Sequence, residues 1–425
     1  MIPSPTGARQ LAFSVVAKPT GAACNLDCAY CFFLSKELLY DDARQRMSDD
    51  VLRDYVRTFL ANQPDGEVTL AWQGGEPTMR GLDFFEQAIG LGREYARPGQ
   101  RVVHTIQTNG ILIDDAWAEL LARESVLVGL SLDGPASMHD TYRTNRAGRG
   151  THDQVVRAWR TLQRHGVQTN LLCTVNAANQ DHGAEVYRYF TDELGATHLQ
   201  LIPIVERATV AQLPTLEKGW RSASEHLLYT QHGDRVTSRS VDPAAFGRFM
   251  IEVYDRWVTR DVGRVYLQHV DAALSAVFGV HPVCVHAPEC GNALAVEYNG
   301  DVYSCDHWVE PDWRLGNVAE QDFAELTATP RHQQFNRKKA VELTAQCRAC
   351  PVRTFCNGGC PKDRFVTSRD GEAGHNYLCI GYEAFFGHIR PDLVAMARLI
   401  RQGRAPAEIM DPAVRQRLRP RATVA

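Results

Sequence analysis

The sequence predicts an α/β fold: a partial parallel barrel of six strand–helix units, similar to part of a TIM barrel, followed by a smaller cysteine-rich domain. Six short apolar segments alternate with amphipathic helical patterns up to about residue 206. The alternation then stops, short of the eight units of a complete barrel. Beyond that point the cysteines become dense, with eight of the 12 between residues 284 and 379.

The candidate strands are short, apolar and β-branched, as expected for strands that are buried on both faces. They are residues 12–17, 68–72, 102–108, 127–132, 169–175 and 199–205. Helical patterns lie between them at 48–61, 81–96, 115–122, 152–165 and 183–194. Paired aspartates at 49–50 and 114–115 are typical of helix starts. A helix between successive strands predicts parallel strands whose loops share one face.

The chain after the barrel divides into three further segments. Residues 207–283 are mixed and mostly helical, and 242–260 is an amphipathic helix whose aromatic stripe we assign to the core. Residues 390–425 hold eight arginines against three acids, which predicts a solvated helix and a frayed tail. The expected units are therefore a barrel at 1–240, a helical linker at 241–283, a cluster-binding domain at 284–385 and a C-terminal helix with a basic tail at 386–425.

Composition narrows the class of protein. A net charge of −4 gives no reason to expect nucleic acid as a partner. No run of about 18 apolar residues is present, so we expect no membrane span. The N-terminus lacks a basic start followed by an apolar run, so we expect a cytoplasmic protein. In that compartment 12 cysteines favour metal binding over disulfides.

Three cysteines directly after the first strand carry the most information. Cys24, Cys28 and Cys31 are spaced C-x3-C-x2-C. Three thiolates can hold three irons of a 4Fe–4S cube and leave the fourth iron open to bind and reduce a small molecule. Structural zinc requires four protein ligands, and no histidine lies nearby in the sequence. The position after a strand places the triplet on the face where barrels keep their active sites.

A second group of cysteines lies in the C-terminal third. Four are spaced C-x2-C-x5-C-x3-C, and a glycine turn at Asn299-Gly300 predicts a hairpin. By count, eight thiolates match two four-cysteine iron–sulfur clusters, but a pair of zinc ribbons fits the spacing as well. The eight are Cys284, Cys290, Cys305, Cys347, Cys350, Cys356, Cys360 and Cys379.

Polar residues follow several of the predicted strands, where a barrel places its site residues. Gly74, Gly75 and Glu76 follow the second strand, and paired glycines allow close approach of the backbone. Gln107 and Asn109 lie at the end of the third strand, and Ser131 and Arg143 lie around the fourth. Ile204, an apolar candidate, lies on the sixth. As alternatives, the Gly-Gly-Glu-Pro segment could be a plain loop and Arg143 could form a surface ion pair.

Asp306 immediately follows Cys305. A carboxylate beside an iron–sulfur cluster can take a proton as an electron leaves, which is general-base catalysis coupled to oxidation. The alternative is a solvated aspartate in a turn.

The triplet and the Gly-Gly-Glu-Pro loop together resemble the radical S-adenosylmethionine enzymes. In that superfamily the amino and carboxylate groups of the cofactor chelate the open iron, and its reductive cleavage gives a 5′-deoxyadenosyl radical that abstracts a substrate hydrogen atom. The resemblance implies that the loop receives the amino group, that Ser131 lies near the ribose, and that the sixth strand lies along the adenine. The implied cofactor contacts are Tyr30, Gly74, Gly75, Glu76, Gln107, Asn109, Ser131, Arg143 and Ile204.

The later cysteines resemble the SPASM extension, which carries two auxiliary 4Fe–4S clusters. The resemblance implies one cluster on Cys284, Cys290, Cys305 and Cys360, and another on Cys347, Cys350, Cys356 and Cys379, hence three clusters in all. The remaining cysteine, Cys173, lies in an apolar strand and is expected to be a plain buried thiol.

The Cys305-Asp306 pair resembles anaerobic sulfatase-maturating enzymes. That resemblance implies an unfolded sulfatase segment as substrate, with hydrogen abstraction from the β-carbon of its cysteine or serine. Asp306 would be the base, the remaining electron would leave through the auxiliary clusters, and the product would be Cα-formylglycine. It also implies a ferredoxin- or flavodoxin-type electron donor.

Two alternatives remain at this stage. One is another SPASM peptide maturase that forms thioether or carbon–carbon crosslinks in a precursor peptide. Such enzymes often carry an N-terminal peptide-binding domain, and a first strand that begins near residue 12 predicts no room for one. The other is a non-catalytic zinc or iron–sulfur scaffold, which the open triplet and the Gly-Gly-Glu-Pro loop argue against.

Overall fold

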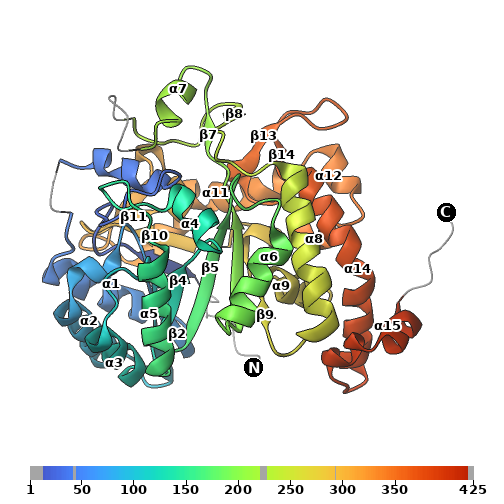
Figure 1. The fold of residues 1–425 in the computed structure, drawn as a ribbon. Coiled ribbons are helices and arrows are strands. Elements are labelled where there is room, and N and C mark those ends of the chain that lie inside the picture. Colours follow the sequence, from blue (N-terminus) through green and yellow to red (C-terminus); the bar gives the residue numbers. More distant parts are fainter. Residues whose placement is uncertain (1–12, 42–44, 221–226, 292, 420–425) are drawn as a thin grey trace, which may run out of the picture.

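A single ten-stranded sheet organises the molecule, and helices cover its outer side (Figure 1). The computed structural model describes residues 13–41, 45–220, 227–291 and 293–419. The strand order is β12-β11-β10-β1-β2-β3-β4-β5-β6-β9, and β1 to β6 are parallel in sequence order. The predicted α/β class with a partial parallel barrel is confirmed.

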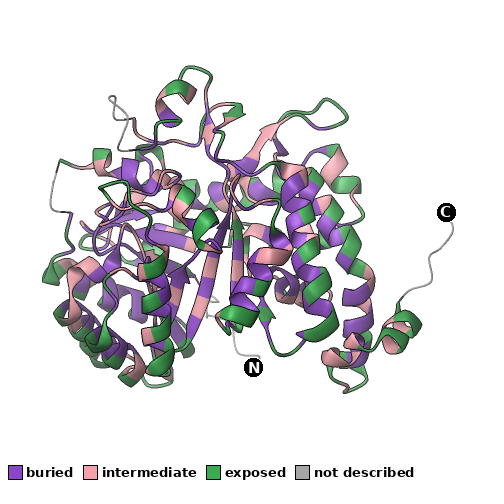
Figure 2. Ribbon diagram, in the orientation of Figure 1, coloured by how far each residue is buried: buried purple, intermediate pink, exposed green. Residues whose placement is uncertain are grey.

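The six predicted strands are present. They are β1 (Ser14–Ala17), β2 (Gly66–Trp72), β3 (Gln100–Thr108), β4 (Leu127–Ser131), β5 (Thr169–Val175) and β6 (His198–Pro203). Residue 12, where the first strand was predicted to begin, lies outside the described residues. The prediction that these strands are buried on both faces is wrong. Buried residues alternate with half-buried or exposed ones, as in β2, where Val68, Leu70 and Trp72 are buried but Thr69 is exposed (Figure 2). One face therefore packs into the core, and the other is more open.

The predicted helices of the barrel are also present. They are α1 (Asp49–Ala61), α2 (Leu82–Tyr95), α3 (Asp115–Arg123), α5 (His152–Arg164) and α6 (Gly183–Arg188), which continues into a π turn at Tyr189–Glu193. Ser48 caps α1 and Asp114 caps α3, since each side chain accepts a hydrogen bond from a backbone N–H of the first turn. A short helix that the sequence analysis missed, α4 (Ala136–Tyr142), follows β4.

The helix predicted at 242–260 is α8 (Pro243–Arg260), and its aromatic stripe is buried as expected. It packs along α14 (Cys379–Arg401). The two backbones approach so closely that a Cβ on Gly247 would lie 2.8 Å from Cα of Gly381. Glycine at both positions therefore allows this helix pair to form.

The prediction of a solvated C-terminal helix is wrong for α14. Ile389, Leu393, Met396 and Leu399 are buried, because they follow helical spacing that the many arginines obscured. Arg415 and Arg419, in and after α15 (Pro412–Leu418), bind the buried carboxylate of Asp392 instead of extending into solvent. Residues 420–425 of the predicted tail lie outside the described residues.

The cysteine-rich segment extends the barrel sheet. β10 (Ala293–Val296) runs parallel to β1, with Ser14 paired to Ala293. β11 (Asp301–Tyr303) and β12 (Arg314–Asn317) follow antiparallel, and the hairpin predicted at Asn299-Gly300 is confirmed. At the other edge, β9 (Tyr266–Leu267) pairs with β6. The sheet thus crosses the boundaries expected near residues 240 and 284.

Shorter elements complete the described chain. The other helices are α9 (Gln268–Ala276), α10 (Phe323–Ala328), α11 (Pro330–Val341), α12 (Ala345–Ala349) and α13 (Arg353–Cys356). Two small hairpins are formed by β7 (Arg207–Ala208) with β8 (Arg235–Val236) and by β13 (Arg364–Val366) with β14 (His375–Asn376). Among the described helices, none combines the length and the apolar character needed to cross a bilayer.

Candidate active site

The cysteine triplet lies in the loop that leaves β1, as the sequence predicts. Cys24 and Cys28 are buried and Cys31 is half-buried. Burial is the main reason why the pKa of the Cys28 thiol lies above its usual value, and charge on Cys31 and Cys24 raises it further. The three thiols are therefore close neighbours in a sheltered loop, which fits a three-thiolate iron–sulfur site.

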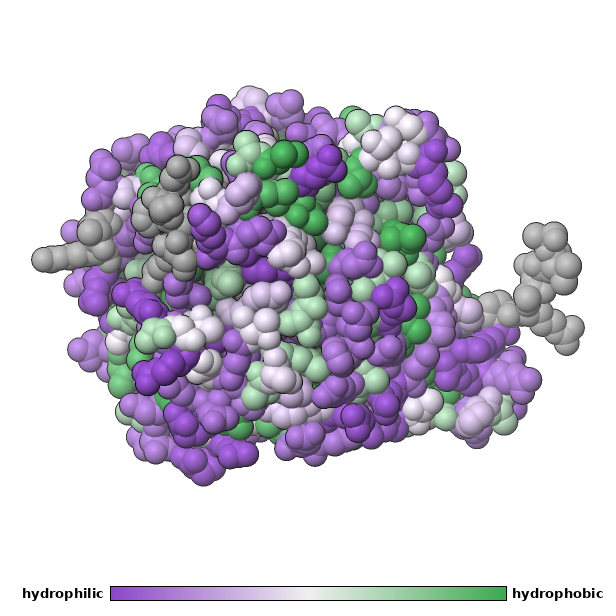
Figure 3. Space-filling model, turned by 45° about the horizontal axis from the view of Figure 1, so that its top comes forward, coloured by the Kyte–Doolittle hydropathy of each residue, from purple (hydrophilic) through white to green (hydrophobic). Residues whose placement is uncertain are grey.

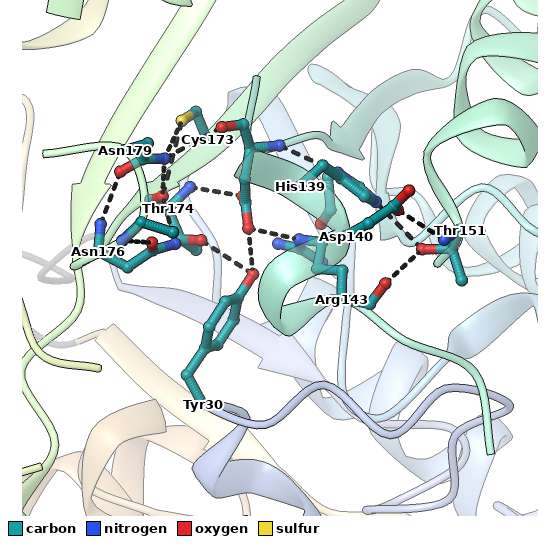
Figure 4. A network of polar contacts seen from close by, with 12 residues as sticks. Tyr30, His139, Asp140, Arg143, Thr151, Cys173, Thr174, Asn176 and Asn179 are labelled. Atoms are coloured by element: carbon teal, nitrogen blue, oxygen red, sulfur yellow. Dashed lines mark hydrogen bonds and ion pairs between the residues drawn. The ribbon is translucent and has the colours of Figure 1, made fainter. Parts of the chain in front are cut away.

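A buried carboxylate fixes this loop to the end of β4. Asp133 accepts hydrogen bonds from the Tyr30 hydroxyl at 2.5 Å, from Nε of Arg143 at 2.9 Å and from the backbone N–H of Thr174 at 2.9 Å (Figure 4). Burial alone would raise the pKa of Asp133, but the Arg143 guanidinium, His139 and the hydrogen bonds from Tyr30 and Thr174 together hold it below its ordinary value. The sequence analysis assigned Asp133 no role, although a carboxylate at a strand end was a signal for one.

Tyr30 and Arg143, both predicted cofactor contacts, thus donate hydrogen bonds to Asp133. Behind them, His139 accepts a hydrogen bond at Nδ1 from the N–H of Asp133, and its Nε2 faces the Thr151 hydroxyl at 3.1 Å. Burial lowers the pKa of His139 to about 3, so this ring is neutral. The network is buried, and it fixes Tyr30, which lies between Cys28 and Cys31 in the sequence.

The Gly-Gly-Glu loop packs directly on the triplet loop. The N–H of Glu76 donates to the carbonyl of Ala23, and a Cβ on Gly75 would lie 2.1 Å from that same oxygen. The Glu76 carboxylate is buried and accepts hydrogen bonds from the Thr108 hydroxyl and the Asn109 N–H, both at 2.7 Å. It therefore joins the ends of β2 and β3.

The other predicted contacts lie at neighbouring strand ends. Gly74 has a φ of +129°, which favours glycine. Nε2 of Gln107 donates to the Ser131 hydroxyl at 3.0 Å, and Nδ2 of Asn109 donates to Oδ1 of Asn25, inside the triplet, at 2.7 Å. The strand ends and the triplet loop therefore form one surface.

A cap covers the triplet loop. The cap consists of residues 207–220 and 227–241, and Figure 1 shows its elements β7, β8 and α7 (Leu213–Leu216) above the sheet. Leu216, Trp220 and Tyr229 of the cap belong to the same buried cluster as Cys24 and Cys28. This packing keeps water away from the thiols.

A buried ion pair anchors the cap to β6. Arg239 binds the carboxylate of Glu206 through Nε at 2.9 Å and Nη2 at 3.1 Å, and Nε1 of Trp220 donates to the same carboxylate at 3.0 Å. Both charged side chains are at most 4% exposed.

On the face that carries the cap, hydrophobic side chains gather near the upper middle of a mostly polar surface (Figure 3).

A cavity of about 290 Å³ lies below the cap. Its walls come from the triplet loop, β6, the cap, α9 and the cysteine-rich segment. Of the predicted site residues, Tyr30, Ile204 and Cys284 line it. The polar side chains in its wall are Gln200, Glu206, Gln231, Gln268, His269, His307, Lys362 and Asp363.

Asp306, the predicted base, does not line this cavity itself, but the next residue in the chain, His307, does. Its carboxylate forms an ion pair with Lys18, which follows β1. Burial favours the neutral acid, but Lys18, His307 and Lys36 together hold the pKa of Asp306 below its ordinary value. The sequence analysis missed Lys18, because the partner lies 288 residues away in the chain.

The eight later cysteines form two sets. Set two, Cys347, Cys350, Cys356 and Cys379, lines one cavity together with Val352 and Gly358. Set one is Cys284, Cys290, Cys305 and Cys360. These thiols lie close enough for the charge of one to raise the pKa of another, and Lys339 lies beside Cys284, Cys290 and Cys360. This grouping fits two four-cysteine clusters. Among the described residues, no three His, Cys, Asp or Glu side chains converge as around a single metal ion.

Cys173 is fully buried in β5.

Two family models match this chain, one over the barrel and one over the cysteine-rich segment. Residues 19–189 match the radical SAM superfamily, and residues 284–351 match SPASM, an iron–sulfur cluster-binding domain. A serine-type anaerobic sulfatase-maturating enzyme of Bacteroides thetaiotaomicron is 38% identical over 93% of this chain and 94% of its own length. A cysteine-type anaerobic sulfatase-maturating enzyme of Clostridium perfringens is 31% identical over 91% of this chain and 99% of its own length.

Solved structures give the same result. A structure described as native anSMEcpe with bound AdoMet superposes with a TM-score of 0.77 at 31% identity, over 91% of this chain and 99% of that one. A second, with bound AdoMet and the Cp18Cys peptide, has the same TM-score and identity, over 92% of this chain and 99% of that one. Streptococcus suis SuiB bound to S-adenosylmethionine has a TM-score of 0.56 at 17% identity, over 83% of this chain and 74% of that one, which shows a shared fold.

Proposed function

The chain belongs to the anaerobic sulfatase-maturating enzymes of the radical SAM superfamily, and from this membership we propose that it oxidises an active-site cysteine or serine of a sulfatase to Cα-formylglycine. It uses S-adenosylmethionine and iron–sulfur clusters. We propose that the clusters are three 4Fe–4S clusters, one on the triplet and one on each later set.

One observation carries the proposal. The cavity below the cap has Tyr30 of the triplet loop in one wall and Cys284 of set one in another. A substrate side chain held there can lose a hydrogen atom toward the triplet side and an electron toward set one. A two-electron oxidation of one carbon requires both losses, together with a base for the accompanying proton.

The cofactor and the clusters, when bound, supply hydrogen-atom abstraction and electron transfer. The chain's own residues do the rest. Cys24, Cys28 and Cys31 hold the first cluster, and Asp133 fixes their loop through Tyr30. The remaining proposed cofactor contacts are Gly74, Gly75, Glu76, Gln107, Asn109, Ser131, Arg143 and Ile204.

Asp306 is the proposed base. It accepts the thiol or hydroxyl proton while the adjacent β-carbon is oxidised to a thioaldehyde or an aldehyde. Water then hydrolyses the thioaldehyde to the aldehyde and releases hydrogen sulfide. The ion pair with Lys18 supports this role, because a carboxyl group that is already ionised can accept a proton. The cap and its Glu206–Arg239 anchor exclude bulk water from the triplet side of the cavity.

The partners follow from the same assignment. We propose that the substrate is an unfolded sulfatase polypeptide, because the reacting side chain has to enter a cavity of about 290 Å³. A ferredoxin- or flavodoxin-type protein is the proposed electron donor, and the cytoplasm is the proposed location. We propose the units 1–240, 241–283, 284–385 and 386–425 as barrel, linker, auxiliary-cluster domain and C-terminal helix.

The test is anaerobic. The protein is reconstituted with iron and sulfide, reduced, and mixed with S-adenosylmethionine and sulfatase peptides that contain either cysteine or serine. Mass spectrometry follows peptide and cofactor together. We expect formylglycine and 5′-deoxyadenosine in equal amounts. Deoxyadenosine without a change in either peptide would overturn the sulfatase assignment in favour of another peptide substrate.

A further inference from the structure

A half-buried guanidinium occupies the junction between the two later cysteine sets. Arg364, at the start of β13, donates through Nε to the carbonyl of Gly358 at 3.0 Å and through Nη1 to that of Lys339 at 2.7 Å. Its Nη2 donates to the carbonyls of Asn357 at 3.0 Å and Gly359 at 3.4 Å. Residues 357–359 are the three that connect Cys356 of set two to Cys360 of set one.

The backbone of this connection is shaped around the guanidinium. Asn357, Gly358 and Gly359 have φ angles of 47°, 73° and 61°, three left-handed residues in succession. That conformation is costly for asparagine and turns the three carbonyls toward one donor. A Cβ on Gly358 would lie 2.7 Å from Nη2 of Arg364. The chain therefore accepts local strain in order to hold a cation between the two sets.

A second cation, which is fully buried, lies against set one alone. Lys339 of α11 is fully buried, and its ammonium donates to the carbonyl of Cys284 at 2.5 Å and to that of Val285 at 2.9 Å. Its charged neighbours include Cys284, Cys290 and Cys360, all of set one.

Neither cation has a carboxylate partner among the described residues. Other cations in this part of the chain do, because Lys362 pairs with Asp363 and Arg369 pairs with Glu383. Burial lowers the pKa of Arg364, and the charges that oppose this shift most strongly come from cysteines of both sets: Cys347, Cys360, Cys290 and Cys356. A charge that is withdrawn from water without a counter-charge is unfavourable, most of all for the fully buried Lys339, so an anionic group has to balance it.

A cluster held by four thiolates is such a group, and one-electron reduction adds a further negative charge to it. Building on the cluster assignment of the proposed function, we propose that Arg364 and Lys339 are positioning residues that raise the reduction potentials of the auxiliary clusters. Arg364 acts on both clusters, because it lies between the sets. Lys339 acts on set one.

This arrangement should give the set-one cluster a higher reduction potential than the set-two cluster. Set one is exposed to two uncompensated cations, and set two to one. Set one is also the set that meets the substrate cavity, through Cys284. The cluster closest to the oxidised carbon is therefore the easier one to reduce, which favours prompt removal of the electron from the substrate.

The test is a redox titration of the reconstituted protein, monitored by electron paramagnetic resonance without cofactor or peptide. Cys290→Ala and Cys379→Ala assign the signals of set one and set two. We expect Arg364→Gln to lower the reduction potentials of both auxiliary clusters. The expected change is about tenfold in the equilibrium constant for reduction, which corresponds to about 59 mV for one electron. Lys339→Gln should lower only that of set one.

Two controls separate charge from structure. Arg364→Lys keeps the charge and should stay near the wild-type potentials, and Arg348→Gln removes an exposed charge beside Cys347 and should shift them much less. Unchanged potentials in Arg364→Gln at full iron content, or an equal shift in Arg364→Lys, would overturn the proposal. If Arg364→Gln fails to retain iron, an unchanged set-one potential in Lys339→Gln overturns it.

The titration needs no peptide oxidation, so its outcome is distinguishable from failure of the proposed function. Potentials that shift as expected in a protein that leaves sulfatase peptides unchanged would support the electrostatic role and reject the substrate.

Discussion

Lys18 and Asp306, which are 288 residues apart in the chain, form an ion pair. Lys18 directly follows β1, and Asp306 follows the hairpin of β10 and β11. The parallel pairing of β10 with β1 brings the two together. The Lys18 ammonium also lies 3.5 Å from the ring centroid of Phe33, just beyond the cysteine triplet. One buried lysine thus connects the triplet side of the site to the proposed base.

Asp306→Asn should abolish peptide oxidation but not cofactor cleavage. The amide cannot accept the proton, and loss of a general base costs about 100-fold to 10,000-fold in rate. Mass spectrometry of peptide and 5′-deoxyadenosine in one reaction checks this. Asp312→Asn is the matched control, because that carboxylate is exposed on the same segment. Formylglycine at the wild-type rate from Asp306→Asn would remove this residue from the mechanism.

Asp133→Asn should weaken both the fold and the first cluster. The change leaves the buried Arg143 guanidinium without its carboxylate, which destabilises proteins by about 3–5 kcal/mol. It also weakens the hydrogen bond that holds Tyr30 in the triplet loop. Denaturant unfolding and iron analysis measure the two effects. Asp153→Asn, at a side chain that is 92% exposed, should change stability by less than about 0.5 kcal/mol.

Gly75→Ala should separate the Gly-Gly-Glu loop from the triplet loop. Its Cβ would lie 2.1 Å from the Ala23 oxygen, and a backbone atom cannot move aside cheaply. We expect weaker S-adenosylmethionine binding, measured by calorimetry on the reconstituted protein. Gly90→Ala is the control: it lies within α2, a Cβ there meets nothing within 4 Å, and stability should rise by about 0.5–1 kcal/mol. Equal binding by both variants would contradict the close approach.

Much of this architecture is predictable from the sequence. Short segments rich in apolar and β-branched residues, separated by amphipathic helical patterns, place β1 to β6. Their burial on both faces was not predictable in this way, because one face of each strand is only partly buried. Capping residues such as Ser48 and Asp114 mark helix starts to within a residue. Cysteine spacing singles out the triplet and the later eight, because thiolate ligands need fixed separations.

Long-range partners are not predictable in this way. No local pattern pairs Lys18 with Asp306, Glu206 with Arg239, or β10 with β1, because each pairing depends on the assembled sheet. Arg364 shows the same limit. Its neighbours in the chain are ordinary, and its role is visible only once the loop at 357–359 folds around it.

Glu297→Gln should change how stability depends on pH. Glu297 is 2% exposed, and its Oε1 has no hydrogen-bond partner among the described residues. Burial, the main cause, raises its pKa to about 7 from an unfolded value near 4.5. The folded state therefore holds a proton that the unfolded chain releases, so stability falls as pH rises from about 4.5 to about 7 and is flat above.

Denaturant unfolding of wild type and Glu297→Gln between pH 5.5 and pH 8 measures this effect. Over the whole titration the wild type should lose about 3 kcal/mol that the glutamine variant keeps. Parallel curves for the two proteins across this range would show that Glu297 is not the group responsible.

Asp392→Asn should release the C-terminal segment. The carboxylate is fully buried, accepts a hydrogen bond from the Tyr254 hydroxyl at 3.0 Å, and binds Arg415 and Arg419. Burial opposes its ionisation, but the two guanidiniums hold its pKa below the ordinary value. Both arginines are partly exposed and can return to water, so we expect a loss at the lower end of the 3–5 kcal/mol typical of broken buried pairs, about 3 kcal/mol.

The release should also be visible locally. Hydrogen exchange in α15 should become fast in Asp392→Asn, while β1 to β6 keep their protection, because α15 packs mainly on α14 and the turn at Pro406–Met410. Glu408→Gln is the matched control. It breaks the ion pair of Glu408 with Arg404, which lies in solvent, and should leave both stability and exchange in α15 close to wild type. Unchanged exchange in α15 of Asp392→Asn would show that apolar packing alone holds this segment.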